Sequence, residues 1–466
     1  MESFIKFLSA SNYRKKLDTK IDLTDKEIVD NVTKVAWPSI FEALFIALIS
    51  SVDTIMVATL GAFAISAVGI VNQPRMLMLA PIMALNMAVT VIVSRRKGQD
   101  NKEGANQILR NAILLCFGLA LGLNLLGFTF AEPLLEFAGA NADYIADSII
   151  YFKIICIGNF FYSLSLTITA AQRGVGNTKI SMVTNLTANL VNIVFNYLLI
   201  NGIWIFPRWG IMGAAVATAI GNIAALVLAV YSVIHRSDFL FLDLKEKWTI
   251  QKDNVRQILN IGWPSIIEQV FLRIGFFTFA KQVFLLGTLA SSSHQITMNI
   301  MHLSFSVGNG LAIASTALVG RSLGQKRTDL AKLYGKSVQH IGRVFAIILA
   351  LITFVLRYQF ISLYSDDPEI VRITSELFII LAAMLYFQMS QVITIGSLRG
   401  AGDVRFVAGL SMVSIMLVRP GLTQLFAYNL GFGILGAWVG TFIDQLIRWG
   451  ASLLRYNSGK WVNVEV

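Results

Sequence analysis

The sequence predicts an all-α polytopic membrane protein, with about 12 transmembrane helices in two six-helix lobes related by a parallel pseudo-two-fold repeat. Three observations predict this fold. Hydrophobic residues make up 55% of the chain and charged residues only 14%, whereas soluble domains carry roughly 25% charge. Apolar runs near the ~20 residues that cross a bilayer recur along the whole chain. Finally, motifs of the first half return in the second half at a constant spacing.

The apolar runs divide the chain into two sets of six. The first set lies near 34–58, 64–93, 105–128, 144–171, 180–200 and 210–234, and the second near 258–285, 290–319, 337–356, 371–396, 406–428 and 434–454. We therefore predict a cytosolic lead at 1–33, an N-terminal lobe at 34–234, a cytosolic linker at 235–257, a C-terminal lobe at 258–455 and a cytosolic tail at 456–466. An even number of spans places both termini on one side of the membrane.

Basic residues indicate which side that is. Lys and Arg crowd the N-terminal segment and the loops near 95–102, 173–179, 236–256, 321–332 and 399–405, whereas the alternate loops carry few. The positive-inside rule then predicts a multi-pass protein of the cell (plasma) membrane, the inner membrane of a bacterium, with both termini cytoplasmic. The net charge of +11 reports this topology and an attraction to membrane lipids. We expect no nucleic-acid partner.

An internal repeat is the most specific signal in the sequence. Trp37–Glu42 (WPSIFE) returns as Trp263–Glu268 (WPSIIE), and Arg173–Gly176 (RGVG) returns as Arg399–Gly402 (RGAG). The differences 263 − 37 and 399 − 173 are equal, and we call this constant spacing the repeat interval. Two halves of equal topology indicate a parallel duplication about an axis along the membrane normal. Lobes related in this way commonly enclose a central cavity and open to the two sides in turn.

The first span carries two carboxylates, Glu42 and Asp53, within an otherwise apolar run. Eleven residues bring these acids back to the same helix face, roughly three turns apart. Pro38 precedes them and cannot donate a backbone hydrogen bond, so it weakens the helix there. An ionisable group inside a span costs ~2.5–3.5 kcal/mol on insertion scales and is a functional candidate by default. At the position equivalent to Asp53 the second half has Phe279.

Four asparagines follow one face of the fifth span with 4-3-4 spacing: Asn185, Asn189, Asn192 and Asn196. One repeat interval further on, their equivalents are mostly apolar: Ser411, Ile415, Val418 and Leu422. Amide groups can coordinate a sodium ion or hydrogen-bond a carboxyl group, but they can also hold neighbouring helices together. We prefer an ion site because the asparagines occur only in the half that has Asp53.

The C-terminal lobe carries charges of its own. Glu268 and Arg273 lie in the seventh span, and Asp444 with Arg448 forms an i,i+4 pair in the last span. Because buried charges are usually paired, we expect Glu268 and Arg273 to belong to an internal salt-bridge network. The alternative is a substrate or second ion site that draws on Glu42, Glu268, Arg273 and Lys281.

Two other classes of protein fit the sequence poorly. A primary pump needs a phosphate-binding loop, G-x-x-x-x-G-K-[ST]; the segment 335–337 (GKS) imitates its end, but Leu330 stands where the first glycine is required. An intramembrane enzyme needs a facing nucleophile and base or paired acids, and the acids here are spread over repeat positions. We therefore expect neither an enzyme nor a cofactor apart from a coupling ion.

Several motifs, taken in order and at their spacing, resemble one known family over nearly the whole chain. They are the duplicated Trp-Pro start, Val52–Thr54 (VDT), Asn192–Ile200 (NIVFNYLLI) and Gly213–Thr218 (GAAVAT). The sequence resembles the multidrug and toxic compound extrusion (MATE) transporters. This resemblance implies a secondary active antiporter that exports amphipathic, often cationic organic compounds such as drugs and toxins in exchange for protons or sodium, by alternating access. We expect it to act as a monomer.

The resemblance also implies roles for individual residues. Asp53 matches the first-span aspartate that couples transport to the ion, and Asn192 and Thr218 match residues of the same site. Pro38 matches the proline where the first helix bends in some members. Asn196 falls where some members have a second aspartate, so a proton fits slightly better than sodium, although sodium at Asp53, Asn192 and Asn196 stays open. The predicted cation-coupling set is Asp53, Asn189, Asn192, Asn196 and Thr218.

One rival function remains within the same superfamily. Arg273 and Lys281 could bind an anionic headgroup, which would suit a flippase for lipid-linked or anionic lipids. Asp53 with its asparagines is instead an arrangement that suits cation coupling, and it favours the antiporter.

Overall fold

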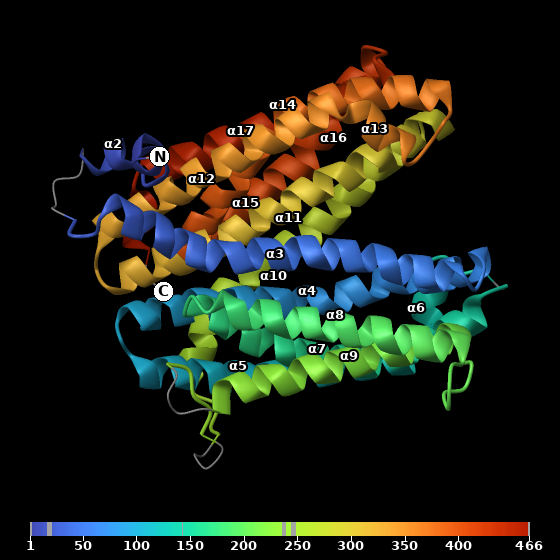
Figure 1. Cartoon of the computed structure of the whole chain (residues 1–466), viewed down its shortest axis with the longest axis horizontal. Coiled ribbons are helices and arrows are strands. Elements are labelled where there is room, and N and C mark those ends of the chain that lie inside the picture. The colour runs from blue at the N-terminus through green and yellow to red at the C-terminus, as the bar shows by residue number, and fades with distance from the viewer. Residues whose placement is uncertain (1, 16–20, 142, 235–238, 244–247, 465–466) are drawn as a thin grey trace. The chain divides into compact units, whose positions relative to one another are not determined.

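A computed structural model describes residues 2–15, 21–141, 143–234, 239–243 and 248–464 as helices joined by short connections (Figure 1). Positions 235–238 and 244–247 of the predicted linker and 465–466 of the predicted tail lie outside these ranges. The chain forms two compact units, which we call the N-terminal unit (41–263) and the C-terminal unit (1–40 and 264–466). The division between them falls inside two helices, beside Pro38 in the first and directly before Pro264 in the second.

The helices of the described residues follow the predicted apolar runs. In the first half the long ones are α3 (Asp25–Ala58), α4 (Ala62–Gly98), α5 (Lys102–Thr129), α7 (Ile145–Gly174), α8 (Thr178–Asn201) and α9 (Gly210–Ile234). In the second half they are α10 (Lys252–Phe284), α11 (Thr288–Gly324), α12 (Thr328–Val355), α14 (Pro368–Gly400), a segment composed of α15 (Val404–Val413), η1 (Ser414–Val418), α16 (Arg419–Thr423) and η2 (Gln424–Asn429), and α17 (Gly433–Asn457). By length and composition, nine helices of the described chain could cross a membrane.

The duplication is visible in where the helices begin. The helices α4, α5 and the short α6 (Ala131–Phe137) begin at residues 62, 102 and 131, and α11, α12 and the short α13 (Arg357–Ser362) begin at 288, 328 and 357. Each start in the second set follows its counterpart by the repeat interval, since 288 − 62, 328 − 102 and 357 − 131 all equal 263 − 37. A glycine precedes α4 and α11 with φ of 102° at Gly61 and 104° at Gly287, a conformation that other residues adopt only with strain. The predicted repeat is therefore confirmed.

The two units are also built in the same way internally. In the N-terminal unit α7 packs against α4, α5 and α9, and α9 in turn packs against α8 (Figure 1). In the C-terminal unit the equivalent α14 packs against α11, α12 and α17. The core around α7 includes Phe152, Ile155 and Cys156, and the core around α14 includes Leu381 and Trp438. This packing fixes the faces from which the polar residues of each unit project.

One helix of the second half departs from the regular α-helical pattern. Its two π-helical stretches, η1 and η2, flank the single α-helical turn α16. A π-turn accommodates an extra residue within a helix and is often found at functional sites. No such interruption occurs in α8, the helix at the equivalent place in the first half.

Candidate functional site

Asp53 of α3 is half-buried and is held by two asparagines of α8. The Asn196 Nδ2 donates to Asp53 Oδ1 at 2.8 Å. The Asn192 amide is best oriented with its nitrogen toward the carboxylate, 2.8 Å from Oδ1 and 3.1 Å from Oδ2, while its oxygen faces the backbone N–H and hydroxyl of Thr218, each at 3.1 Å. This orientation follows from the hydrogen-bond pattern, because a carboxylate can only accept. Four residues of the predicted set therefore meet at one point.

Close packing of α8 on α9 brings Asn192 to this position. A Cβ atom added at Gly221 of α9 would lie 2.6 Å from the Ala188 carbonyl oxygen and 3.2 Å from the Asn192 Cβ. Only glycine therefore allows the two helices to approach so closely. Asn192 and Asn196 are 6% and 2% exposed. Because both are buried, their amide nitrogens have to find acceptors within the protein, and the Asp53 carboxylate provides one for each.

The remaining asparagines of the predicted set have other partners. The Asn185 Nδ2 donates to Glu42 Oε1 at 2.5 Å, whereas the Asn189 Nδ2 donates to the backbone oxygen of Asn185 at 2.7 Å. Asn189 was expected beside Asp53 because of its spacing, but its amide is satisfied by its own helix, as short polar side chains often are. The structure therefore brings Asn192 and Asn196 to the carboxylate and leaves Asn189 out.

Arg75 of α4 is a component of this site that the sequence analysis missed. The Arg75 Nε donates to Asn159 Oδ1 at 3.2 Å, and its charge acts electrostatically on Asp53. A basic residue within the apolar run at 64–93 was the signal that could have identified it. The site thus combines one ionisable carboxylate, two amide groups and one fixed positive charge.

Glu42 and Glu268 occupy equivalent places, and each lies next to the arginine of the repeated Arg-Gly motif. In the N-terminal unit Glu42 Oε1 lies 3.8 Å from Arg173 Nη1 and accepts from the Ser181 hydroxyl at 3.2 Å. In the C-terminal unit Glu268 Oε1 lies 2.8 Å from Arg399 Nη2 and accepts from a serine hydroxyl at 2.9 Å. Because the same ion pair occurs in both units, its geometry favours a structural role over an ion or substrate site.

Glu268 forms an internal salt bridge, as expected, but Arg273 does not join it. Glu268 pairs with Arg399 of α14 instead, whereas Arg273 and Lys281 are exposed. Five residues of α-helix rotate a side chain by roughly 140°, so Arg273 leaves the face on which Glu268 is buried. A substrate or second ion site formed jointly by Glu268, Arg273 and Lys281 is not assembled in the described C-terminal unit.

Pro38 lies inside α3, which the structure describes as one helix from Asp25 to Ala58. It is four residues before Glu42 and two residues before the point where α3 passes from one compact unit to the other. Its missing N–H removes one backbone hydrogen bond of the helix at that point. The bend at Pro38 stays a prediction.

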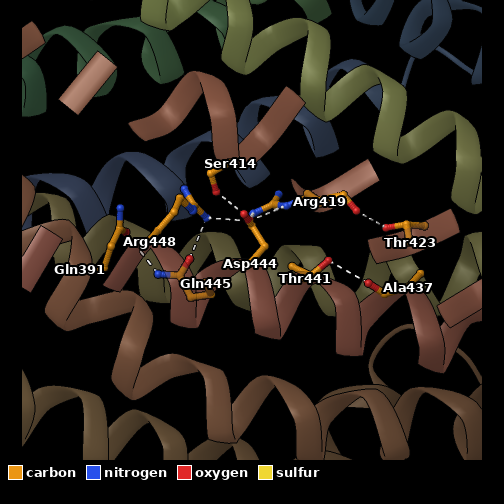
Figure 2. Close-up of polar contacts among 9 residues, drawn as sticks. All are labelled: Gln391, Ser414, Arg419, Thr423, Ala437, Thr441, Asp444, Gln445 and Arg448. Carbon is orange, nitrogen blue, oxygen red and sulfur yellow. Dashed lines mark hydrogen bonds and ion pairs between the residues drawn. The ribbon is translucent and has the colours of Figure 1, made fainter. Parts of the chain in front are cut away.

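A second cluster of charges in the C-terminal unit surrounds the fully buried Asp444 of α17 (Figure 2). Arg419 donates to Asp444 Oδ2 from Nη2 at 2.8 Å and from Nε at 3.0 Å. Arg448 Nη2 lies 3.5 Å from the same oxygen, and the Ser414 hydroxyl donates to the other oxygen. The predicted pair of Asp444 with Arg448 is confirmed, but Arg419, which stands before a proline in the apolar run at 406–428, was missed.

Comparison with known proteins also finds two equivalent halves in this chain. The model of the MatE family matches residues 38–198 and 264–423, two stretches whose starts are separated by the repeat interval. The chain is 27% identical over 432 residues to the "Uncharacterized transporter YisQ" of Bacillus subtilis, covering 92% of this chain and 94% of that protein. It is 27% identical over 441 residues to the "Probable multidrug resistance protein NorM" of Thermotoga maritima, covering 93% of each.

Solved structures share the fold at lower sequence identity. An outward-facing multidrug resistance MATE family transporter of the MOP superfamily superposes with a TM-score of 0.86 at 18% identity, covering 93% of this chain and 97% of that one. A mutant of the Vibrio cholerae MATE transporter VcmN gives the same TM-score, identity and coverage.

Proposed function

The chain belongs to the MatE family of membrane transporters, and from that premise we propose that it exports amphipathic, cationic organic compounds in exchange for protons or sodium. Its fold is that of MATE transporters, with 12 transmembrane helices in two lobes. The proposed antiporter works by alternating access in the cell membrane, as a monomer, with both termini in the cytoplasm. The distribution of basic loops supports that orientation, and the relatives named for multidrug resistance support the class of substrate.

The observation that carries this proposal is the Asp53 carboxylate held by the amides of Asn192 and Asn196. A cation that binds Asp53 neutralises its negative charge. The attraction between the carboxylate and the two amide donors is thereby reduced. A protonated carboxyl group must itself donate a hydrogen bond. The hydrogen bonds between α3 and α8 are then weakened, because those to a neutral acceptor are only about half as strong as those to a carboxylate, and this links the occupancy of the ion site to the position of α3.

This link is sufficient for antiport if the two openings of the transporter differ in their affinity for the ion. A ligand shifts a conformational equilibrium only by its differential affinity for the two states. We propose that the empty, ionised Asp53 and the occupied Asp53 favour opposite openings. Substrate leaves through one opening and the coupling ion through the other.

The rival function is the flipping of anionic or lipid-linked lipids. It is motivated by Arg273 and Lys281, which are exposed on α10 and could bind a phosphate group. A dye-efflux assay and a lipid-flipping assay on the same proteoliposomes separate the two functions. Dye export driven by an ion gradient supports the antiporter, and lipid flipping without dye export supports the rival.

Replacing either asparagine at the ion site is expected to impair coupling, whereas replacing Asn189 is not. Asn192→Leu and Asn196→Leu each remove a hydrogen bond to a charged group, worth about 1.5–3 kcal/mol, or roughly a ten- to hundredfold change in the apparent ion affinity. Asn189→Leu is the matched control, since it makes the same change on the same helix but removes only a bond within that helix. The measurement is efflux against ion concentration in proteoliposomes; equal behaviour of all three variants would show that the asparagines serve packing alone.

Export of a monovalent cation is expected to be insensitive to the membrane voltage. Moving one charge across the potential supplies ~2.3 kcal/mol per 100 mV, but the exchange of one ion for one monocation moves no net charge. Asp53 is the one acid of the site, so one ion per cycle is the expected count. The measurement is dye efflux from proteoliposomes at imposed potassium diffusion potentials, with the ion gradient held constant. Efflux that scales with the imposed voltage would show that a second acid also carries charge in the cycle.

A further inference from the structure

The two units keep the same register at the start of their fifth long helices. In the N-terminal unit Asn185 donates to Glu42, and in the C-terminal unit Ser411 donates to Glu268. The two donors are separated by the repeat interval, and so are the two acceptors, because 411 − 185 equals 268 − 42. The structure therefore places Ser411 where Asn185 stands in the other unit.

Further along the same helices the register has changed by one residue. A Cβ added at Gly213, the fourth residue of α9, would lie 2.8 Å from the Leu199 carbonyl oxygen. A Cβ added at Gly436, the fourth residue of the equivalent helix α17, would lie 2.5 Å from the Phe426 carbonyl oxygen. The difference 426 − 199 exceeds the repeat interval by one. One residue has therefore been inserted on the way; the π-helical η1 lies wholly within this interval, whereas η2 begins only at Gln424, two residues before Phe426. A π-turn is an insertion of this kind.

The inserted residue changes which side chains are equivalent. Beyond η1, equivalent residues are separated by the repeat interval plus one residue. This spacing places Arg419 at the position of Asn192 and Thr423 at that of Asn196. Without the inserted residue, the repeat interval would place the apolar Val418 and Leu422 at these two positions. The two units therefore differ more sharply than the sequence suggests: an amide faces the ion site of one unit, and a guanidinium stands at the same place in the other.

Contacts of Arg419 agree with this placement. Its guanidinium carbon lies 5.3 Å from the ring centre of Phe276 and 5.7 Å from that of Phe279, and Phe279 is the counterpart of Asp53. Its side chain is 4% exposed, and it gives two hydrogen bonds to the fully buried Asp444 (Figure 2). The guanidinium thus lies beside Phe279, the counterpart of the coupling acid, as the Asn192 amide lies beside Asp53, and it has a carboxylate of its own in Asp444.

Building on the proposed exchange at Asp53, we propose that Arg419 is a tethered cation that permanently fills the C-terminal counterpart of the ion site. An arginine keeps its proton in proteins, and it is covalently attached, so this cation can neither titrate nor leave. Asp444 balances its charge in the way that Asp53 balances the exchangeable ion. Ion exchange is thereby confined to the N-terminal unit, and the C-terminal site would accept a monovalent cation only after the guanidinium has been removed.

The experiment counts the cations bound to purified protein in detergent, without any transport step. Radioactive sodium binding measures sodium, and infrared difference spectroscopy after a pH step measures protons on buried carboxyl groups. Arg419→Gln is expected to bind one cation more than the unmodified protein, as sodium or as a proton on Asp444. Adding Asp444→Asn should remove this gain. Arg448→Gln is the matched control with no expected gain, because it removes the other guanidinium near Asp444 and leaves Arg419 in place.

A second variant keeps the proposal testable if Arg419→Gln does not fold. Phe279→Asp restores an acid at the counterpart of Asp53, where Arg419 can pair with it, so we expect no additional bound cation. A gain in Phe279→Asp, no gain in folded Arg419→Gln, or a gain that survives Asp444→Asn would each overturn the proposal. Asp53→Asn tests the proposed ion exchange at Asp53 separately from the proposal for Arg419. If Asp53 does not bind the coupling ion, Asp53→Asn loses no bound cation, whatever the result for Arg419→Gln.

Discussion

Asp53→Asn is expected to abolish ion-driven efflux while leaving the protein folded. The substitution keeps the shape of the side chain but removes the negative charge that binds the coupling ion, so the site imitates its occupied state permanently. Uphill export should fall to the level of protein-free liposomes, a loss larger than that of any other single substitution considered above. Dye efflux from proteoliposomes under an imposed ion gradient measures the loss.

Two controls make that result specific. Circular dichroism and gel filtration in detergent should be unchanged, since Asp53 is half-buried and an amide can still pair with Asn192 and Asn196. Asp143→Asn makes the same chemical change at an exposed position before α7, and it should leave transport intact. Full uphill export by Asp53→Asn would remove Asp53 from the mechanism.

Asp444→Ala is expected to lower the free energy of unfolding by about 3–5 kcal/mol, the usual cost of breaking a buried ion pair. The loss should lie at the upper end because Arg419 and Arg448 share this carboxylate, and both would be left without it in an environment that is costly for unpaired charge. Unfolding in mixed micelles with a denaturing detergent, followed by circular dichroism, measures the change.

Glu369→Ala is the matched control for this loss of stability. Glu369 pairs with Arg372 at 3.0 Å, but the two side chains are 58% and 61% exposed. Exposed pairs contribute about 0–1 kcal/mol, so the control should unfold almost as the unmodified protein does. Equal effects of the two substitutions would show that burial of the Asp444 network adds nothing to stability.

Much of the fold could be predicted because two strong periodic signals determine it. The thickness of the bilayer sets the length of each apolar run, and the duplication sets a constant spacing, so helices such as α4 and α11 begin where the repeat places them. The insertion in η1 could not be predicted in this way. It adds one residue to an already apolar run, too small a change in hydropathy or length to be noticed, but it moves Arg419 rather than Val418 into the position of Asn192.

The site was predictable where a residue type was unusual for its surroundings, and unpredictable where only tertiary contacts decide. Asp53, Asn192 and Asn196 are polar groups in apolar runs, and the structure brings them together. Asn189 carries the same signal, but its own helix satisfies it. The partner of Glu268 is Arg399, which lies far along the chain on α14, and no local spacing indicates which distant cation a buried acid will meet.

The measurement that tests the account most directly is efflux of a monovalent cationic dye from proteoliposomes in which one gradient at a time is applied. A pH gradient or a sodium gradient is imposed alone, without ATP and with the voltage clamped at zero by potassium and valinomycin. If Asp53 couples export to an ion, one of these two gradients drives the dye against its own concentration gradient, and Asp53→Asn eliminates this movement. Uphill movement with neither gradient, or no uphill movement with both, would contradict this coupling.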